Sequence, residues 1–250
     1  IGVILAVALT PRGQRHELRR VIQRPLLIAR GLCGGGALAL FYLTLFELST
    51  GRAMVINLTY VLWGSLMAAV FLNESLRRRQ LAGMGVALAG LPLLVGLGAG
   101  GVGWADGVAL LGAVMAGVVV ILIRYLVRTE SSKTIYASQS VYGALILLPF
   151  ADFGDMAPAP MALGVMVVGG VLVAAGQMVM TLAYRHLPVA RGASMQLLIP
   201  VTTTLGGIAC FGERYSLWEG LGGALILAGC LVAVTSRTPN SRLPSVGSKA

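Results

Sequence analysis

The amino-acid sequence carries one apolar pattern twice, in two copies 139 residues apart. Residues 41–90 align without a gap on residues 180–229. In both copies a small residue followed by an arginine precedes a long apolar stretch, which is followed by a glutamate, Glu74 or Glu213. A second apolar stretch then carries two glycines seven positions apart. Because an internal repeat of this length is one structural unit that buries its apolar face on its neighbour, we expect two related halves.

The composition points to an all-α integral membrane protein. Hydrophobic residues make up 57% of the chain and charged residues 11%, and the mean hydropathy is +0.86. A soluble domain carries about 25% charged residues, so this chain cannot cover its surface for water. The apolar runs of roughly 20 residues match the length that crosses a hydrocarbon core of about 30 Å. The 34 glycines allow membrane helices to approach closely.

Hydropathy predicts about nine helical segments with short polar links. The longest link is the basic stretch 12–24. The repeat offset places residues 1–11 against residues 140–150, so the segment at 104–126 has no counterpart in the first half. We therefore expect that the first helix of a bundle of five plus five helices is missing from the N-terminus. The predicted segments lie near residues 1–11 (incomplete), 25–47, 53–72, 80–98, 104–126, 134–150, 160–184, 190–211 and 217–235.

The placement of charges predicts the topology. Seventeen of the 19 Lys and Arg residues fall in alternating links and in the C-terminal tail, on one side of the membrane. Only Arg52 and Arg214 fall on the other side, together with Asp106, Asp152 and Asp155. Since cytoplasmic links are rich in Lys and Arg, the first set and the C-terminus are expected to be cytoplasmic. Five helices per half then make the two repeats inverted, and the net charge of +10 indicates topology, not nucleic-acid binding.

These residues resemble a known family. The second copy contains residues 191–200 (RGASMQLLIP), 211–214 (FGER) and 222–229 (GGALILAG), and the first copy contains the related residues 73–76 (NESL) and 81–90. Together they resemble the EamA family of the drug/metabolite transporter superfamily, over essentially the whole chain. The sequence departs from the family pattern where the first copy lacks the proline found in the second copy.

The resemblance implies a secondary transporter, an exporter of small organic metabolites, with a small-molecule substrate and the lipid bilayer as its partners. It implies a multi-pass protein of the inner (plasma) membrane with a cytoplasmic C-terminus, without enzymatic activity, cofactor or bound nucleic acid; a homodimer is left open. The expected organisation is a first EamA repeat at 1–98 that is N-terminally truncated, a link at 99–103, a second repeat at 104–236, and a disordered cytoplasmic tail at 237–250.

Two amide side chains at equivalent positions of the repeats, Asn57 and Gln196, are the first candidates for substrate binding. Polar groups at membrane depth are costly and often functional. At equivalent depth in inverted repeats, the two amides can converge on one cavity and hydrogen-bond a neutral, zwitterionic or aromatic solute, which we favour over a polyanion. The alternative is that they only hydrogen-bond between packed helices.

Further candidates share a helix face with these amides or with one another. Tyr60 lies one turn after Asn57, and Trp63 lies one turn further. Gln177 and Thr181 have the i, i+4 spacing of one helix face. Tyr42 is the repeat equivalent of Thr181. The predicted substrate contacts are therefore Asn57, Gln196, Gln177, Tyr60, Trp63, Thr181 and Tyr42.

Pro200 is the predicted hinge. It falls in the middle of the apolar segment 190–211, where a proline removes a backbone hydrogen bond and can kink a helix. Its repeat equivalent is Val61. The kink can serve alternating access, or it can be a bend that neighbouring helices tolerate.

Two glutamates are predicted to cap helix N-termini, and a role in proton coupling is left open for two other residues. Glu74 and Glu213 belong to opposite membrane faces in an inverted repeat, and each is expected to cap the N-terminus of the helix that follows it. Glu47 and His186 are repeat equivalents near helix ends. Proton coupling through either of them is an alternative to a plain interfacial position.

Other chemistry has weak support in the sequence. The glycine-rich stretch 96–101 has the spacing of a dinucleotide motif but follows a membrane segment, without a βαβ unit. Cys33, Cys210 and Cys230 have no paired spacing, so neither a metal nor a disulfide is expected. A membrane-embedded enzyme, or a non-transporting membrane scaffold, is the alternative to a carrier.

Overall fold

The computed structural model describes residues 15–48, 50–95, 103–150, 160–211 and 216–235. Every regular element in these ranges is a helix, which confirms the prediction of an all-α membrane bundle. The elements are α2 (Arg15–Gln23), α3 (Pro25–Thr44), α4 (Thr50–Leu58), α5 (Tyr60–Phe71), α6 (Arg78–Val95), α7 (Trp104–Leu126), α8 (Ser132–Leu147), the 3-10 turn η2 (Leu148–Phe150), α9 (Pro160–His186), α10 (Val189–Gln196), α11 (Ile199–Phe211) and α12 (Leu217–Thr235).

Five helical spans among the described residues are long and apolar enough to cross a membrane. They are α3, the combined span Arg52–Phe71 of α4 and α5, α7, α9 and α12. Each coincides within a few residues with a segment predicted from hydropathy. Most large apolar side chains of α9 are exposed, as expected for a helix surface that faces lipid.

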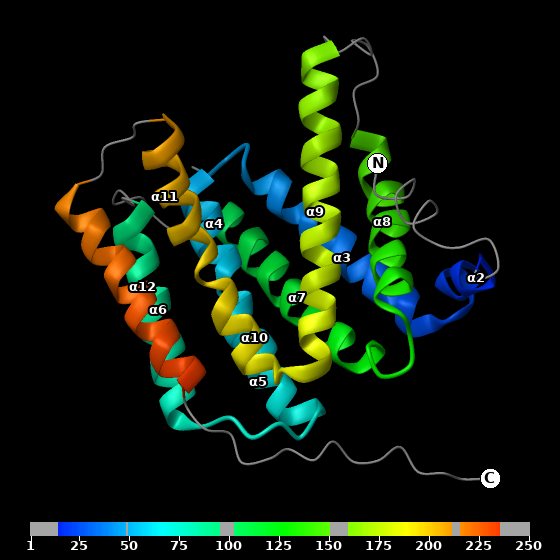
Figure 1. Ribbon diagram of the computed structural model, residues 1–250, viewed down its shortest axis with the longest axis horizontal. Coiled ribbons are helices and arrows are strands. Elements are labelled where there is room, and N and C mark those ends of the chain that lie inside the picture. The colour runs from blue at the N-terminus through cyan, green and yellow to red at the C-terminus, as the bar shows by residue number, and fades with distance from the viewer. Residues whose placement is uncertain (1–14, 49, 96–102, 151–159, 212–215, 236–250) are drawn as a thin grey trace.

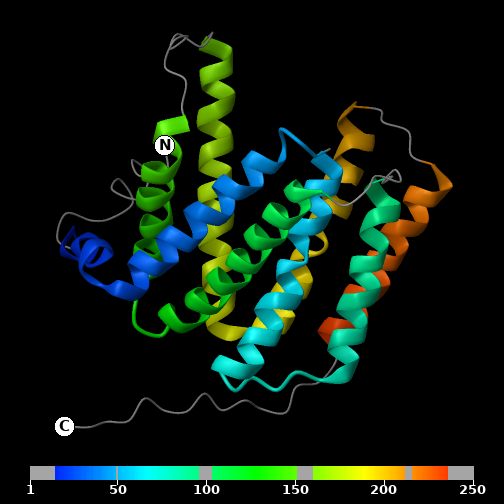
Figure 2. The same cartoon turned by 180° about the vertical axis from the view of Figure 1, so that it is seen from behind.

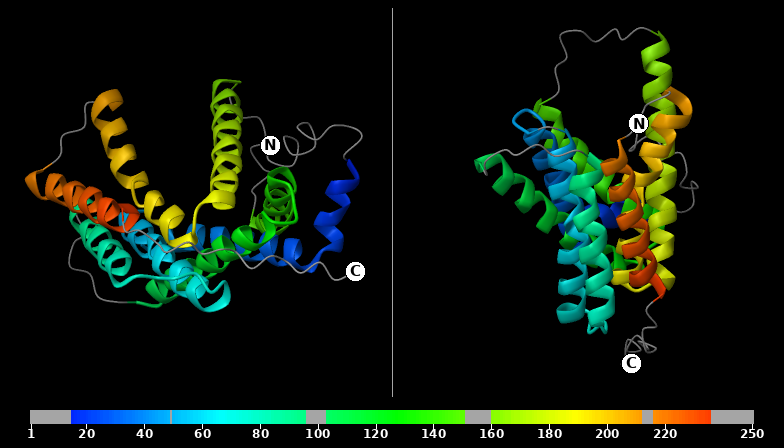
Figure 3. Two further views of the ribbon diagram at one scale, coloured as in Figure 1. Left: turned by 60° about the horizontal axis from the view of Figure 1, so that its bottom comes forward. Right: turned by 90° about the vertical axis from the view of Figure 1, so that its left-hand side faces the viewer.

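The helices form a layer from which two helices project. α3 packs against both α7 and α8, and α5 packs against α7. α3 and α7 lie side by side in the middle of the molecule (Figures 1 and 2). α6 and α12 lie side by side at one edge. α9 and α11 rise from the same side of the layer, with α10 at their base (Figure 3, left).

The repeated glycines bring α6 and α12 into backbone contact. A Cβ atom added at Gly83 would lie 2.6 Å from the carbonyl oxygen of Gly229, and one at Gly90 would lie 2.6 Å from that of Gly222. The helices therefore run antiparallel and cross where neither carries a side chain, as small residues permit in membranes. Gly83 and Gly222 are repeat equivalents, as are Gly90 and Gly229. The contact between Gly83 and Gly229 therefore corresponds to the contact between Gly222 and Gly90 in the other repeat.

A break in the same place interrupts the long helix of each repeat. α4 ends before Thr59 and α10 ends before residues 197–198, so that α5 and α11 begin as new helices. The N–H of Thr59 donates to Ile56 O (3.1 Å), and the equivalent N–H of Leu198 donates to Met195 O (3.2 Å). Both are i→i−3 bonds, which tighten the turn.

The two breaks have different local causes. In the first copy the Thr59 hydroxyl also donates to Ile56 O (2.6 Å), a side-chain bond of the kind that bends helices. In the second copy Pro200 has no N–H to continue the helix. Pro200 therefore does not lie in the middle of a helix, as the sequence suggested. It lies in the first turn of α11, where its missing N–H is tolerated.

The basic stretch 12–24, predicted as a polar link, contains the helix α2. Val21 is buried against α8, next to Tyr136 and Ala137, and Arg20 and Arg24 each lie 3.4 Å from a carboxylate oxygen of Glu130. The helix was not predicted because the many charged residues of this stretch lower its hydropathy, although one face of the helix is apolar. The apolar segment 1–11, Glu213 and the predicted tail 237–250 lie outside the described residues.

Candidate functional site

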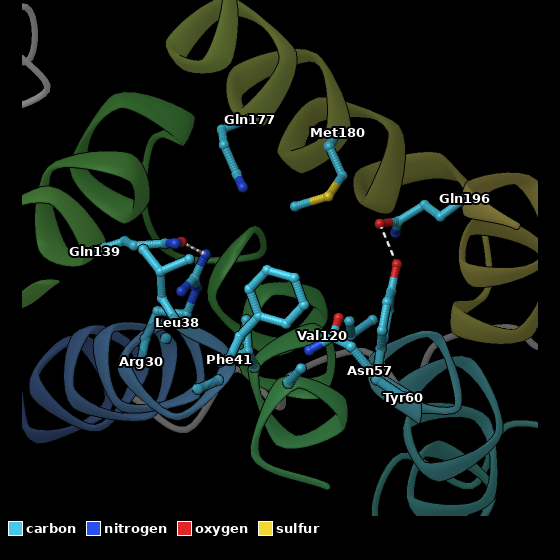
Figure 4. Close-up of a pocket in the computed structure, with 14 residues that line it drawn as sticks. Arg30, Leu38, Phe41, Asn57, Tyr60, Val120, Gln139, Gln177, Met180 and Gln196 are labelled. Carbon is cyan, nitrogen blue, oxygen red and sulfur yellow. Dashed lines mark hydrogen bonds between the residues drawn. The ribbon is translucent and has the colours of Figure 1, made fainter. Parts of the chain in front are cut away.

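A cavity of about 320 Å³ lies between the two halves of the chain. This volume is at the lower end of the range for small-molecule sites. α3, α4 and α5 from the first half and α7, α8, α9 and α10 from the second half contribute to its wall. The described lining residues are Arg30, Gly34, Ala37, Leu38, Phe41, Asn57, Tyr60, Ala116, Val119, Val120, Gln139, Gln177, Met180 and Gln196 (Figure 4).

The two equivalent amides both line this cavity. Asn57 is the next-to-last residue of α4 and Gln196 is the last residue of α10, so each stands at the helix break of its repeat. The Gln196 amide accepts a hydrogen bond from Tyr60 Oη (2.5 Å) and donates one to Tyr184 Oη (2.7 Å). The two tyrosines hold the orientation of the amide, which keeps a second N–H and a second lone pair for another partner.

Asn57 and Gln177 present amides that the described part of the protein does not use. Neither side chain forms a hydrogen bond with another described residue, and both line the cavity. The Gln177 side chain points from α9 toward the space above Phe41 in Figure 4. Because amides at membrane depth are costly to leave unsatisfied, these groups can hydrogen-bond a polar solute in the cavity.

Three of the predicted contacts lie away from the described cavity wall. The Trp63 indole N–H donates to Thr59 Oγ1 (3.3 Å). Thr181 is buried and donates to Gln177 O (2.7 Å), a bond within its own helix. Tyr42 is half exposed and its ring contacts Phe41. The structure thus brings together Asn57, Tyr60, Gln177 and Gln196, and a substrate-binding role for Trp63, Thr181 or Tyr42 stays a prediction.

The cavity also contains a charged residue, Arg30, which was counted above among the basic residues of the links. Arg30 lies in the second turn of α3 and its side chain is buried in the cavity wall. Its Nη2 donates to Gln139 Oε1 (2.5 Å). The cavity wall therefore carries a positive charge beside the amides that were predicted from the sequence. The signal was present in the sequence, because an arginine inside an apolar helix is itself a candidate functional residue.

At one end of the bundle, the buried Glu74 connects the halves. Glu74 Oε1 accepts from Arg124 Nε (3.1 Å), and Oε2 accepts from the N–H of Val189 (2.7 Å), the first residue of α10. Arg124 also donates to the carbonyl oxygens of Tyr184 and Arg185. Glu74 therefore caps α10 of the other half, and the prediction that it caps the following helix is wrong.

At the other end of α7, a second ion pair connects the halves. Arg52 Nε lies 2.7 Å from Asp106 Oδ1, and Asp106 Oδ2 accepts from the N–H of Gly103 (2.7 Å). These contacts hold the start of α4 against the start of α7. Both ends of α7 thus bear a charged contact with the first half, and the cavity lies between them.

The helices define a polytopic helical membrane protein, with a cavity lined by both halves of the chain. The sequence model of the EamA-like transporter family matches residues 1–96 and 103–235 of this chain. The chain belongs to this family, and hence to the drug/metabolite transporter superfamily.

Solved structures agree with this fold. One similar chain, described only as the crystal structure of a protein, has a TM-score of 0.74 and 22% sequence identity, and the match covers 93% of this chain and 83% of that chain. At this identity the similarity shows the fold alone. None of the curated proteins matches the chain.

Proposed function

We propose that the protein is a secondary carrier that exports small organic metabolites across the cytoplasmic membrane by alternating access. The cavity between the halves is the proposed substrate site. The observation that carries the proposal is that Asn57 and Gln196, equivalent residues of the two repeats, meet at this cavity, each beside a helix break. Interrupted helices at the repeat interface form the substrate sites of many secondary transporters.

The two breaks also supply positions at which the halves can bend. α4 can change its angle to α5 at Thr59, and α10 can change its angle to α11 at residues 197–198. Such rearrangement would open and close the two ends of the cavity in turn, with the Glu74–Arg124 contacts released on one side. Since the first copy breaks without a proline, we place the hinge at these turns, with Pro200 as the residue that fixes the start of α11.

The proposal favours a carrier over a membrane-embedded enzyme. The polar groups around the cavity are amides, a tyrosine hydroxyl and one guanidinium, which suit binding better than acid–base chemistry. Within the described residues, no three His, Cys, Asp or Glu side chains form a group that could hold a metal ion.

A thermal-shift panel on the full-length protein in detergent tests the site. The panel contains small organic acids, amino acids, nucleosides, sulfonium compounds and lipophilic cations, each titrated against the wild type and the variants Asn57→Ala and Gln196→Ala. A bound solute stabilises the folded protein by about 2.7 kcal/mol at 100-fold excess over its Kd. Gln23→Ala, which removes an exposed amide of α2, is the matched control.

We expect a solute whose apparent Kd rises roughly 2- to 12-fold in each cavity variant, the effect of one lost hydrogen bond of about 0.5–1.5 kcal/mol. The Kd for Gln23→Ala should equal that of the wild type. A solute that binds all four proteins with the same Kd would show that it does not bind at the amide pair.

A further inference from the structure

Arg30 carries hydrogen-bond donors that no described residue uses. The residue is 1% exposed, and its Nε and Nη1 atoms are buried without a hydrogen-bond partner. Only Nη2 has one, the Gln139 amide oxygen at 2.5 Å. In Figure 4 the guanidinium lies beside Gln139 at one end of the cavity, across Phe41 from Asn57 and Gln196.

This guanidinium is a buried cation in need of an anion. Arg30 is the sixth residue of α3, about 8 Å along the helix from its first residue, and arginine keeps its proton in proteins. A buried charge in a membrane protein is costly unless it is paired. No carboxylate of a described residue forms an ion pair with Arg30. Gln139, a neutral amide, orients the group but does not compensate its charge.

The local sequence leaves room for the guanidinium to face the cavity. Gly34 follows one turn after Arg30 on the same face of α3 and also lines the cavity. A Cβ atom at Gly34 would lie 2.5 Å from Arg30 Nη1 and 3.4 Å from Gln139 Cδ. The absence of a side chain at this position therefore makes the space that the free Nη1 occupies.

We propose that the cavity binds a small organic acid with a single carboxylate, which pairs with Arg30. The apolar body of the acid lies against Phe41, and its far end reaches the amides of Asn57 and Gln196. This proposal rests on the proposed carrier function and specifies its substrate class.

The number of charges selects a monocarboxylate. Arg30 is the only cation among the described lining residues, so a phosphate ester or dicarboxylate would bring an uncompensated negative charge into the cavity. None of the described lining residues is acidic, so the ammonium group of a zwitterion would find amide oxygens but no counter-charge. A monoanion satisfies Arg30 and leaves no charge unpaired.

Matched acid and amide pairs test the proposal on the full-length protein in detergent. The probes are benzoate and benzamide, phenylacetate and phenylacetamide, and hexanoate and hexanamide, titrated by thermal shift and by calorimetry. The proteins are the wild type, Arg30→Gln, Gly34→Ala and, as control, Arg78→Gln, which removes an exposed arginine of α6. Gly34→Ala displaces the guanidinium but keeps the charge.

We expect at least one acid to bind the wild type roughly 10- to 150-fold more tightly than its amide, as charge-assisted hydrogen bonds predict. Arg78→Gln should keep this preference. Arg30→Gln should abolish the preference for the acid, and Gly34→Ala should reduce it. If Arg30→Gln does not fold, Gly34→Ala still tests the role of the guanidinium.

Equal binding of acid and amide by the wild type overturns the proposal. So does an acid preference that survives in Arg30→Gln or, where that variant does not fold, an acid preference that is undiminished in Gly34→Ala. If no acid binds but a neutral or cationic solute binds with loss in Asn57→Ala, the anion assignment fails and the carrier stands. If no solute of any charge binds or is transported, the carrier proposal fails as well.

Discussion

Glu74→Gln is expected to destabilise the protein strongly, because it leaves Arg124 buried without a counter-charge. The Arg124 and Glu74 side chains are 5% and 6% exposed, so solvent screens the pair little. Removing one partner of such a pair costs about 3–5 kcal/mol. Glutamine is close in size and can still accept the N–H of Val189, so the loss falls mainly on the ion pair. At about 2–4 °C per kcal/mol for a chain of this length, the unfolding midpoint should fall by roughly 6–20 °C.

The assay is reversible unfolding in mixed micelles, followed by circular dichroism, for Glu74→Gln, Arg124→Gln and the double variant. Since the two side chains share one contact, the double variant should cost less than the sum of the single variants, by roughly 0.5–3 kcal/mol. Glu47→Gln, an exposed carboxylate, is the control and should change stability little. A cost below about 1 kcal/mol for Glu74→Gln, with additive single effects, would refute the assigned role of the ion pair.

Three further substitutions test other parts of the structure. Gly90→Ala should lower the unfolding midpoint in the same assay, because its Cβ would lie 2.6 Å from a carbonyl oxygen of α12. The control Gly85→Ala should leave the midpoint unchanged, because a Cβ there meets nothing within 4 Å. Equal midpoints for the two variants would contradict the close crossing of α6 and α12. Tyr60→Phe should raise the Kd of a bound solute roughly 2- to 12-fold, because it removes the hydrogen bond that orients the Gln196 amide. An unchanged Kd in the titration would argue that Tyr60 does not position this amide. Pro200→Ala should keep transport in proteoliposomes, since the first repeat breaks without a proline, and loss of transport in a folded variant would return the hinge to the proline.

The repeat and the hydropathy pattern were sufficient to predict the helical fold and four of the cavity residues. The 139-residue offset relates Asn57 to Gln196 in the sequence alone, and their shared depth follows from the repeat. Tyr60 was found because it lies one helical turn from Asn57. These predictions need only periodicity, which the sequence shows directly.

The remaining features depend on which helices become neighbours, and helix periodicity does not contain that information. Arg30 and Gln139 lie on different helices, and nothing in their spacing shows that they meet. Glu74 was assigned to the helix that follows it because capping is usually local, yet its partners lie in the other half. The break at Thr59 was missed since threonine is common in apolar helices and interrupts them only in some contexts.

The most direct test of the account is solute counterflow in proteoliposomes containing the full-length protein. The labelled solute is the one that binds in the thermal-shift panel, and the proteins are the wild type, Gln196→Ala and Gln23→Ala. We expect the labelled solute to accumulate in vesicles with the wild type or Gln23→Ala, and to move much more slowly in vesicles with Gln196→Ala and in protein-free vesicles. Movement by the wild type no faster than in protein-free vesicles, or an unchanged rate in Gln196→Ala, would contradict a carrier whose site lies between the halves.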